Sequence, residues 1–343
     1  METTKEITNV LNKAGLKLSD FHNVDSLTDC YIDYAKNIDK KKINIGFPLL
    51  DEQMRGLRVQ ELLTVVAGTG IGKSALALNF LLNFVKKTNE LTVLFSLEMS
   101  SIGIGERIFQ IEMDKFGFEI ENGFIKQDKK FIENCRGLKG SLNNLVIITN
   151  RIEVHSIPEY IKTIQNLRND KVRLVCVDYL GLMDNNYFQK DEYLRVTDNM
   201  KKLYSYAKTE NIAIINLSQT SRADVKDRNG NAGLSLYSGK GSGEVENSSD
   251  FFITLEKIEL EISGKMEQGL INKINAVLYY NEKHSTESGE IDLMKLVIHK
   301  NRRGKKGVIY VTFNRKNLRI KEYNEKDFET VNTTNEQKPD ISF

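Results

Sequence analysis

A glycine-rich segment between two apolar stretches constrains this 343-residue chain more than any other feature. Residues 62–66 have the composition of a buried strand, and residues 73–87 have helical periodicity. The segment that joins them matches the P-loop pattern, in which backbone N–H groups and a helix N-terminus surround a phosphate. An ordinary glycine turn is the alternative, but it does not require Gly-Lys-Ser directly after a strand. The matching residues are Ala67, Gly68, Thr69, Gly70, Ile71, Gly72, Lys73 and Ser74.

The residue types of this segment predict that the chain binds ATP together with Mg²⁺. Lys73 would place a mobile positive charge on the outer phosphates, and the Ser74 hydroxyl would ligate the metal ion. Ala67 replaces the first glycine of the pattern. We expect that replacement to be tolerated only if the backbone of Ala67 does not need a positive φ.

Apolar strand-like runs alternate with helical patterns from about residue 45 to residue 320. The runs are continuously apolar, which is typical of parallel strands buried on both faces. We therefore predict an α/β fold with a mostly parallel central sheet and helices on both faces. An antiparallel hairpin is predicted at the C-terminal side, where two strand-like runs flank the polar turn 300–304. The expected strands after 62–66 are 91–97, 145–149, 174–177, 212–217, 251–255, 293–299 and 308–313, with helices at 158–168 and 193–209.

Three polar residues end predicted strands at the edge where ligand sites of α/β sheets lie. Asp178 follows the run 174–177 and could support Mg²⁺. Glu98 follows the strand after the P-loop helix and is a candidate general base for the attacking water. A surface glutamate at the start of the next helix explains Glu98 equally well. Gln219 could sense the γ-phosphate, but its pattern alone fits a helix cap equally well.

The two ends of the chain differ from its middle. Residues 1–43 predict a leader with an amphipathic helix that begins near Asp25 and Ser26 and runs into a charged linker. Such a helix must dock on its own domain or on a neighbouring subunit. Residues 322–343 predict a disordered acidic tail with six acidic residues and two lysines, a net charge of −4. The whole chain carries +2, so the other 321 residues carry +6.

Composition excludes several classes of protein. No apolar run reaches about 18 residues, so we expect no membrane span. The polar N-terminus lacks the apolar core of a secretory signal. The three cysteines, Cys30, Cys135 and Cys176, are far apart and form no C-x-x-C pair for zinc or redox chemistry. We therefore expect a reduced, cytoplasmic protein.

The motifs together resemble the hexameric replicative DNA helicases of the DnaB type, which are RecA-like P-loop ATPases. The match begins with Gly-Phe-Pro-Leu-Leu-Asp at 46–51, where the family has Gly-Phe-x-x-Leu-Asp. It continues in family order through the P-loop and the segments around Glu98, Asp178 and Gln219. The resemblance implies a RecA-like helicase ATPase domain over residues 44–321. It also implies that Glu98 is the catalytic base, Asp178 the magnesium acid and Gln219 the γ-phosphate sensor.

Two further segments carry implied roles. Residues 242–250 resemble the family stretch that follows the DNA-binding loop of the central channel, which implies that Lys240, Gly241 and Gly243 approach single-stranded DNA phosphates. A flexible glycine loop is the alternative, and the family often has Arg-Glu where this chain has Lys-Gly. The turn at 300–302 matches the family's Lys-Gln-Arg hairpin tip. This implies that Lys300 and Arg302 reach the γ-phosphate bound by the adjacent subunit. Without the resemblance, a solvated basic turn is the better interpretation.

Two departures from the family pattern are visible. About 44 residues precede the matching core, too few for the N-terminal domain with which such helicases bind primase. Residues 256–292 are longer than expected between the equivalent strands, and their polar part, 281–289, predicts a surface excursion. We therefore expect a short form of the phage or plasmid kind.

The implied function is an ATP-dependent replicative DNA helicase that forms a ring, expected to be a hexamer. It would move 5′ to 3′ on single-stranded DNA and unwind forked DNA, with ATP and Mg²⁺ as cofactors. A helicase loader and a primase are the expected partners, in the cytoplasm of a bacterium or an infected host cell. Two alternatives stay open: a RecA-type recombinase or recombination mediator that works as a filament, and an ATP-switched loader subunit without unwinding activity.

Overall fold

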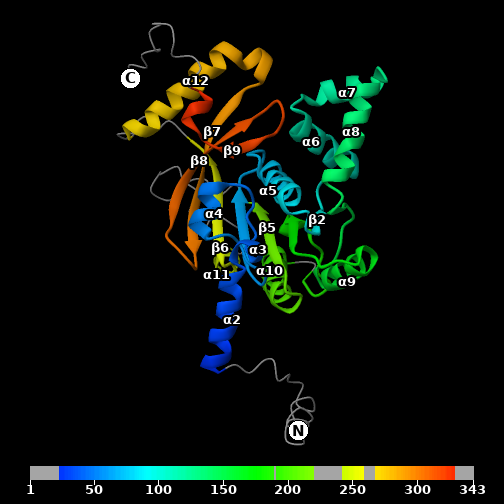
Figure 1. Ribbon diagram of the computed structural model, residues 1–343, viewed down its shortest axis with the longest axis vertical. Coiled ribbons are helices and arrows are strands. Elements are labelled where there is room, and N and C mark those ends of the chain that lie inside the picture. The colour runs from blue at the N-terminus through cyan, green and yellow to red at the C-terminus, as the bar shows by residue number, and fades with distance from the viewer. Residues whose placement is uncertain (1–22, 189–190, 220–241, 259–266, 329–343) are drawn as a thin grey trace, which may run out of the picture. The chain divides into compact units, whose positions relative to one another are not determined.

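The computed structural model describes residues 23–188, 191–219, 242–258 and 267–328 (Figure 1). The chain divides into two units, Met1–Lys42 and Ile43–Phe343, and each is described by itself. The first unit contains α2 (Val24–Lys36) and α3 (Ile38–Lys41). A capping box between Asn23 and Ser26 starts α2, slightly before the predicted start, because Asn23 supplies the cap. No residue of α2 is buried.

A nine-stranded sheet forms the centre of the second unit, in the order β3-β2-β4-β5-β1-β6-β7-β8-β9. The first six strands in this order pair in parallel, and β7, β8 and β9 continue the sheet antiparallel. This confirms the predicted α/β fold and its antiparallel hairpin. The strands are β1 (Leu62–Ala67), β2 (Thr92–Ser96), β3 (Leu145–Ile148), β4 (Leu174–Asp178), β5 (Ala213–Gln219), β6 (Phe251–Lys257), β7 (Ile291–Asn301), β8 (Gly307–Asn314) and β9 (Ile320–Glu322).

Helices cover both faces of this sheet. Side chains alternate along β1: Leu63 and Val65 pack with α4, α5 and α6, and Leu62 and Val66 pack with α9 and α10. None of the helices in the described ranges is long and apolar enough to cross a membrane. The helices of this unit not yet bounded are α4 (Pro48–Met54), α5 (Lys73–Thr88), α6 (Ser101–Met113), α7 (Gly117–Ile125), α8 (Lys129–Ser141), α9 (Ile157–Arg168), α10 (Glu192–Thr209), α11 (Ser242–Asn247) and α12 (Gln268–Ser288), with short 3₁₀ turns at Val154–Ser156, Leu180–Leu182 and Glu325–Asp327.

Strand register brings the ends of four strands to one edge of the sheet. Ala67 at the end of β1 pairs with Gln219 at the end of β5. Ser96 at the end of β2 pairs with Asp178 at the end of β4. Because β1, β2, β4 and β5 are parallel, their carboxyl ends meet along this edge, where ligand sites of α/β sheets form.

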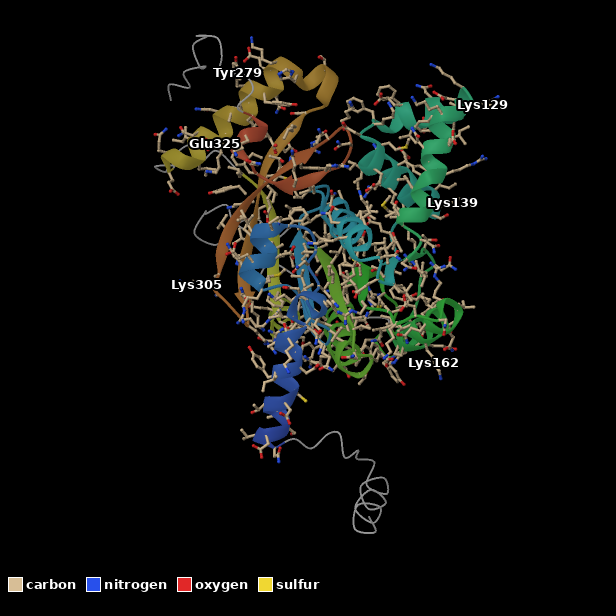
Figure 2. The ribbon with its side chains drawn as sticks, viewed as in Figure 1. Lys129, Lys139, Lys162, Tyr279, Lys305 and Glu325 are labelled. Carbon is tan, nitrogen blue, oxygen red and sulfur yellow. The ribbon has the colours of Figure 1, made fainter. Side chains whose placement is uncertain are left out.

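The turn between β7 and β8 lies at the opposite end of the parallel strands, where those strands begin. Phe251, at the start of β6, pairs with Leu63 near the start of β1 and with Asn301 at the end of β7. Lys305 marks this turn in Figure 2. The length of β1 therefore separates the turn from the carboxyl edge of the sheet.

Three helices, α6, α7 and α8, lie between β2 and β3, where the alternating pattern did not define the bounds of any helix. Ile120, Phe131 and Cys135 form a small core of their own among these helices. Lys129 and Lys139 lie on the exposed side of α8 (Figure 2). Residues 281–288 of the expected surface excursion form the last turns of α12, a helix that lies between β6 and β7 in the chain.

The folded unit extends past the boundary predicted at residue 322. Glu322 accepts hydrogen bonds of 3.0 Å from the N–H groups of Leu49 and Leu50 at the start of α4. Phe328 is buried, and its ring stacks on Tyr323. These aromatic contacts hold the segment despite its acidic composition, so residues 322–328 belong to the folded unit. Residues 329–343, the rest of the expected tail, lie outside the described residues.

Candidate functional site

The P-loop joins β1 to α5 at the carboxyl edge of the sheet. Gly70 and Gly72 have positive φ angles of 75° and 112°, which favour glycine. A Cβ at Gly72 would lie 3.2 Å from Phe313 Cε1, so the space there also favours glycine. Ala67 is the last residue of β1, and its φ angle is not positive. The condition for replacing the first glycine of the pattern is therefore met.

Lys73 and Asp178 are buried charges beside this loop, with exposed fractions of 8% and 2%. Burial lowers the pKa of Lys73, and the negative charges of Asp178 and Glu98 act in the opposite direction. Burial raises the pKa of Asp178, opposed by a hydrogen bond from Ser74 and by the charge of Lys73. Lys73 Nζ also lies 4.3 Å from the centroid of the Tyr179 ring. A bound phosphate would add the negative charge that favours the protonated amine.

Ser74 and Asp178 provide two oxygen donors that fit Mg²⁺. Ser74 donates its hydrogen bond to Asp178, whereas Asp178 Oδ1 is buried and has no hydrogen-bond partner among the described residues. Mg²⁺ prefers hard oxygen ligands and is usually held by one or two protein groups, with water and phosphate oxygens completing the octahedron. An unsatisfied carboxylate oxygen beside a serine hydroxyl matches that donor set.

A cavity of about 350 Å³ opens in front of the P-loop. Glu98 lines this cavity together with Lys73 and Ser74. Its side chain is exposed, and it stands two residues after β2. The N–H of Leu97 donates to the carbonyl of Asp178 at 2.7 Å, which fixes the backbone that carries Glu98. A carboxylate on this wall can accept a proton from a water molecule near a bound phosphate.

Gln219 also lines the cavity, and its side-chain amide donates a hydrogen bond to the hydroxyl of Thr69 in the P-loop. The pairing of Gln219 with Ala67 across β5 and β1 brings these two side chains together. Because Thr69 is part of the P-loop, a phosphate bound in the loop can directly change the surroundings of the Gln219 side-chain amide.

Six residues of the cavity wall were not singled out in the sequence: Ala75, Met99, Arg107, Phe313, Arg315 and Leu318. Burial raises the pKa of Asp178, and the positive charge of Arg107 on α6 is one of the groups that oppose this rise. Phe313, Arg315 and Leu318 come from the end of β8 and the turn after it. The guanidinium carbon of Arg315 lies 5.3 Å from the Phe313 ring centroid, and Arg315 also forms an ion pair with Asp292. No local motif marks the last four of these positions; only the strand order and helix packing bring them to the P-loop.

Lys300 and Arg302 do not approach this cavity in their own chain. Lys300 is the second-last residue of β7, and Arg302 begins the β7–β8 turn, at the end of the sheet opposite the P-loop. There, Lys300 Nζ donates to the carbonyl of Glu246 at 2.7 Å, and Arg302 Nη1 lies 3.0 Å from Asp250 Oδ1. Any contact of these cations with a P-loop phosphate would therefore have to be made with another subunit.

The expected DNA-binding residues lie largely outside the described part of the chain. Lys240 and Gly241 are not among the described residues, and Gly243 lies in α11. The segment after α11 is anchored to the sheet, because Ser249 Oγ and Thr64 Oγ1 share a buried hydrogen bond of 2.7 Å. The DNA-binding roles stay predictions from the resemblance.

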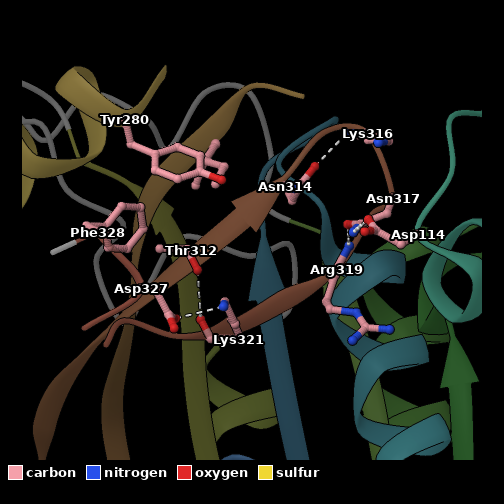
Figure 3. A pocket seen from close by; sticks show the side chains of 11 residues that line it. Asp114, Tyr280, Thr312, Asn314, Lys316, Asn317, Arg319, Lys321, Asp327 and Phe328 are labelled. Atoms are coloured by element: carbon pink, nitrogen blue, oxygen red, sulfur yellow. Dashed lines mark hydrogen bonds and ion pairs between the residues drawn. The ribbon is translucent and has the colours of Figure 1, made fainter. Parts of the chain in front are cut away.

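A second cavity, of about 330 Å³, lies between α12 and β8 (Figure 3). Tyr280 and Phe328 meet edge to face in its wall, with ring centroids 5.5 Å apart. Lys321 pairs with Asp327 at 2.7 Å, and Arg319 donates to a backbone carbonyl of α6. These cations already have partners in their own chain, so we assign the phosphate site to the P-loop cavity.

Comparison with known proteins gives a family match over most of the chain. Residues 42–322 match the family model described as DnaB-like helicase C terminal domain. The chain is 25% identical over 314 residues to the replicative DNA helicase DnaC of Bacillus subtilis, covering 89% of this chain and 62% of that protein. It is 26% identical over 311 residues to the replicative DNA helicase DnaB of Geobacillus stearothermophilus, covering 89% of this chain and 61% of that protein. The chain thus spans about 60% of the length of these relatives.

A solved structure supports the same fold. It is described as a DnaB-like replicative helicase with its interactions with primase. The superposition has a TM-score of 0.67 at 19% identity and covers 89% of this chain and 68% of that one. At this level of identity the likeness establishes the RecA-like arrangement of the core and nothing about partners.

Proposed function

The chain belongs to the DnaB-like helicase C terminal domain family, and on that premise we propose that it is an ATP-dependent replicative DNA helicase. It assembles as a ring, a hexamer, that moves 5′ to 3′ on single-stranded DNA and unwinds duplex at a fork. One observation carries the proposal: the P-loop cavity and the residues Lys300 and Arg302 lie at opposite ends of the parallel strands of one sheet. Two copies must adjoin before both sets of residues meet on one nucleotide.

In this proposal the chain's own side chains prepare ATP for hydrolysis. Lys73 and the N–H groups of the P-loop hold the outer phosphates. Mg²⁺ held by Ser74 and Asp178 supplies further positive charge at the phosphates. Glu98 accepts the proton of the attacking water, and Gln219 responds to the presence or loss of the γ-phosphate through its contact with Thr69.

Lys300 and Arg302 act on the nucleotide of the adjacent subunit. A cation supplied in trans stabilises the negative charge that develops during phosphoryl transfer. It also makes hydrolysis depend on assembly, because a lone subunit lacks it. Arg302 has a side chain 45% exposed, so it is accessible to an anion from outside its own chain.

Assembly in this proposal uses the leader. The helix α2 carries an apolar stripe in which Val24, Leu27 and Tyr31 are exposed by 78%, 52% and 60%. An isolated short amphipathic helix gains stability only by burying such a stripe. We assign the stripe to the neighbouring subunit of the ring. In the channel, Lys240, Gly241 and Gly243 hold single-stranded DNA by its phosphates.

The proposed ring works with a loader and a primase in the cytoplasm of a bacterium or an infected host cell. The main support for these partners is the family itself. A solved helicase of similar fold is described with its primase interactions. Unwinding of forked DNA can be tested without either of these partner proteins.

That test is strand displacement on forked DNA with ATP, with either a 5′ or a 3′ tail. We expect unwinding only when the 5′ tail is present, and none with Lys73→Ala. The matched control is Lys87→Ala in the last turn of the same helix, where Lys87 is exposed. Filaments instead of rings in electron micrographs would favour the recombinase. ATP binding without strand displacement would favour the loader subunit.

A further inference from the structure

The basic turn between β7 and β8 is held by its own chain before any neighbour arrives. Lys300 Nζ donates to the carbonyls of Glu246 and Asn247 at 2.7 and 3.1 Å. These carbonyls are at the C-terminal end of α11, where the helix dipole is negative and favours a cation. Lys300 is thus placed against the segment that directly follows residues 220–241.

Arg302 is held by two side chains from different elements. Its Nη1 lies 3.0 Å from Asp250 Oδ1 and donates to Tyr204 Oη on α10 at 3.1 Å. The guanidinium carbon is 5.8 Å from the Tyr204 ring centroid, within the range of a cation–π contact. A third contact, from Nη2 to the carbonyl of Asn247, is longer at 3.5 Å.

Asp250 is a rigid anchor for this arrangement. Its side chain is 7% exposed, and its second oxygen, Oδ2, accepts the N–H of Leu62 at 2.9 Å. The backbone of Asp250 also pairs with Leu62 and accepts the N–H of Arg302 at 3.2 Å. One carboxylate therefore connects the start of β1 with the arginine of the turn, and charge-assisted bonds of this kind fix geometry.

The neighbouring Arg303 shows what a purely structural arginine looks like here. Its side chain is 12% exposed and pairs with Glu61 at 2.8 Å. Its guanidinium carbon lies 5.2 Å from the centroid of the Phe251 ring. Arg302, by contrast, is 45% exposed although it has oriented partners. An arginine has five N–H donors, so the Arg302 contacts leave donors for an external anion.

We propose that Asp250 and Tyr204 are positioning residues for Arg302, holding its guanidinium in the geometry in which it meets the nucleotide phosphate of the adjacent subunit. This rests on the proposed function, because it takes the trans contact of Arg302 as given. A flexible arginine would have to be ordered at each hydrolysis event, whereas a pre-oriented one contributes its charge without that entropic cost. In this proposal Asp250 and Tyr204 act on the reaction through Arg302, while Asp250 also holds the start of β1 through Leu62.

The test is steady-state ATP hydrolysis by the assembled full chain with Tyr204→Phe and Asp250→Asn. We expect kcat to fall about threefold to tenfold for Tyr204→Phe and about tenfold or more for Asp250→Asn, with KM changed less than about twofold. Tyr204→Phe keeps the ring and removes only the hydroxyl. It therefore tests the proposal even if Asp250→Asn fails to fold through loss of its contact with Leu62. Tyr206→Phe on the same helix is the matched control and should leave kcat unchanged.

To distinguish positioning of Arg302 from a purely structural role of Tyr204, Tyr204→Phe is repeated in an Arg302→Ala background. We expect no further loss of kcat there, because the residue that Tyr204 positions is gone. A wild-type kcat for Tyr204→Phe, or the same loss with and without Arg302, overturns the inference. If the wild-type chain itself fails to hydrolyse ATP, the proposed function fails instead, and the two failures are separate observations.

Discussion

Ala67 and Gln219 lie opposite one another at the ends of two adjacent parallel strands, β1 and β5. That register places the amide of Gln219 on the hydroxyl of Thr69, two residues into the P-loop. The strand β5 also separates β1 from β4. Gln219, which contacts the loop, therefore lies on the strand between the P-loop strand β1 and the strand β4 that carries the buried carboxylate of Asp178.

Asp178→Asn should separate metal binding from stability. The Mg²⁺ concentration for half-maximal hydrolysis should rise at least about tenfold, because one of the two oxygen donors loses its charge. Since burial raises the pKa of Asp178, a neutral amide should raise the melting temperature of the nucleotide-free protein. The matched variant Glu98→Gln should lower turnover about a hundredfold but keep the Mg²⁺ midpoint of the hydrolysis that remains. An unchanged Mg²⁺ midpoint in Asp178→Asn would argue against the metal site.

Asp51 makes stability depend on pH. Burial raises the pKa of Asp51 from 3.8 to about 6, against the N–H groups of Ile45, Gly46 and Phe47, which favour the carboxylate. The folded state therefore keeps a proton that the unfolded state has lost. The stabilisation is complete below pH 3.8. It falls as the pH rises toward 6, by at most about 3 kcal/mol.

Urea unfolding between pH 4 and pH 6.5 measures this effect. Asp51→Asn should remove the fall in the free energy of unfolding over that window. Glu52→Gln, at an exposed position on the same helix, should leave the fall in place. The prediction is wrong if the wild type and Asp51→Asn show parallel pH profiles.

Arg302→Ala should leave only a small residual rate of hydrolysis, because it removes a cation that acts in trans. If Arg302 serves the neighbour's nucleotide, Arg302→Ala and Lys73→Ala each lose nearly all turnover alone. Mixed before assembly, they should regain hydrolysis, because some interfaces then combine an intact Lys73 with an intact Arg302. The measurement is ATP turnover at several mixing ratios. Mixtures that stay inactive at every ratio would argue that both residues serve the same subunit.

Single-stranded DNA binding should weaken steeply with salt. Each phosphate neutralised by a lysine contributes a slope of about −0.7 in log K against log salt. Lys240→Ala should reduce the slope by about that amount for every subunit that contacts the strand. Fluorescence anisotropy of a labelled oligonucleotide over a salt series measures it. A wild-type affinity that is independent of salt would contradict phosphate binding in the channel.

Consecutive residues determined the P-loop and the parallel sheet. Gly70, Gly72 and Lys73 are close together in the chain, so their joint role in binding phosphate can be predicted without knowledge of any tertiary contact. The buried strands are continuously apolar, and parallel strands share a carboxyl edge, so the sequence also predicted that Asp178, Glu98 and Gln219 would gather near the loop. The structure places these three residues at that edge; their catalytic roles stay predictions.

Only the tertiary structure decided which distant residues join that site and which do not. Arg107 and Arg315 enter the cavity through helix packing and the position of β8, which no local pattern encodes. The β7–β8 turn lies at the far edge because β7 runs antiparallel to β6, so Arg302 meets Asp250 and Tyr204 instead of its own P-loop. The sequence by itself determined the chemistry of each short segment. The register of the sheet decided which segments act together, because pairing between distant strands depends on packing across the whole core.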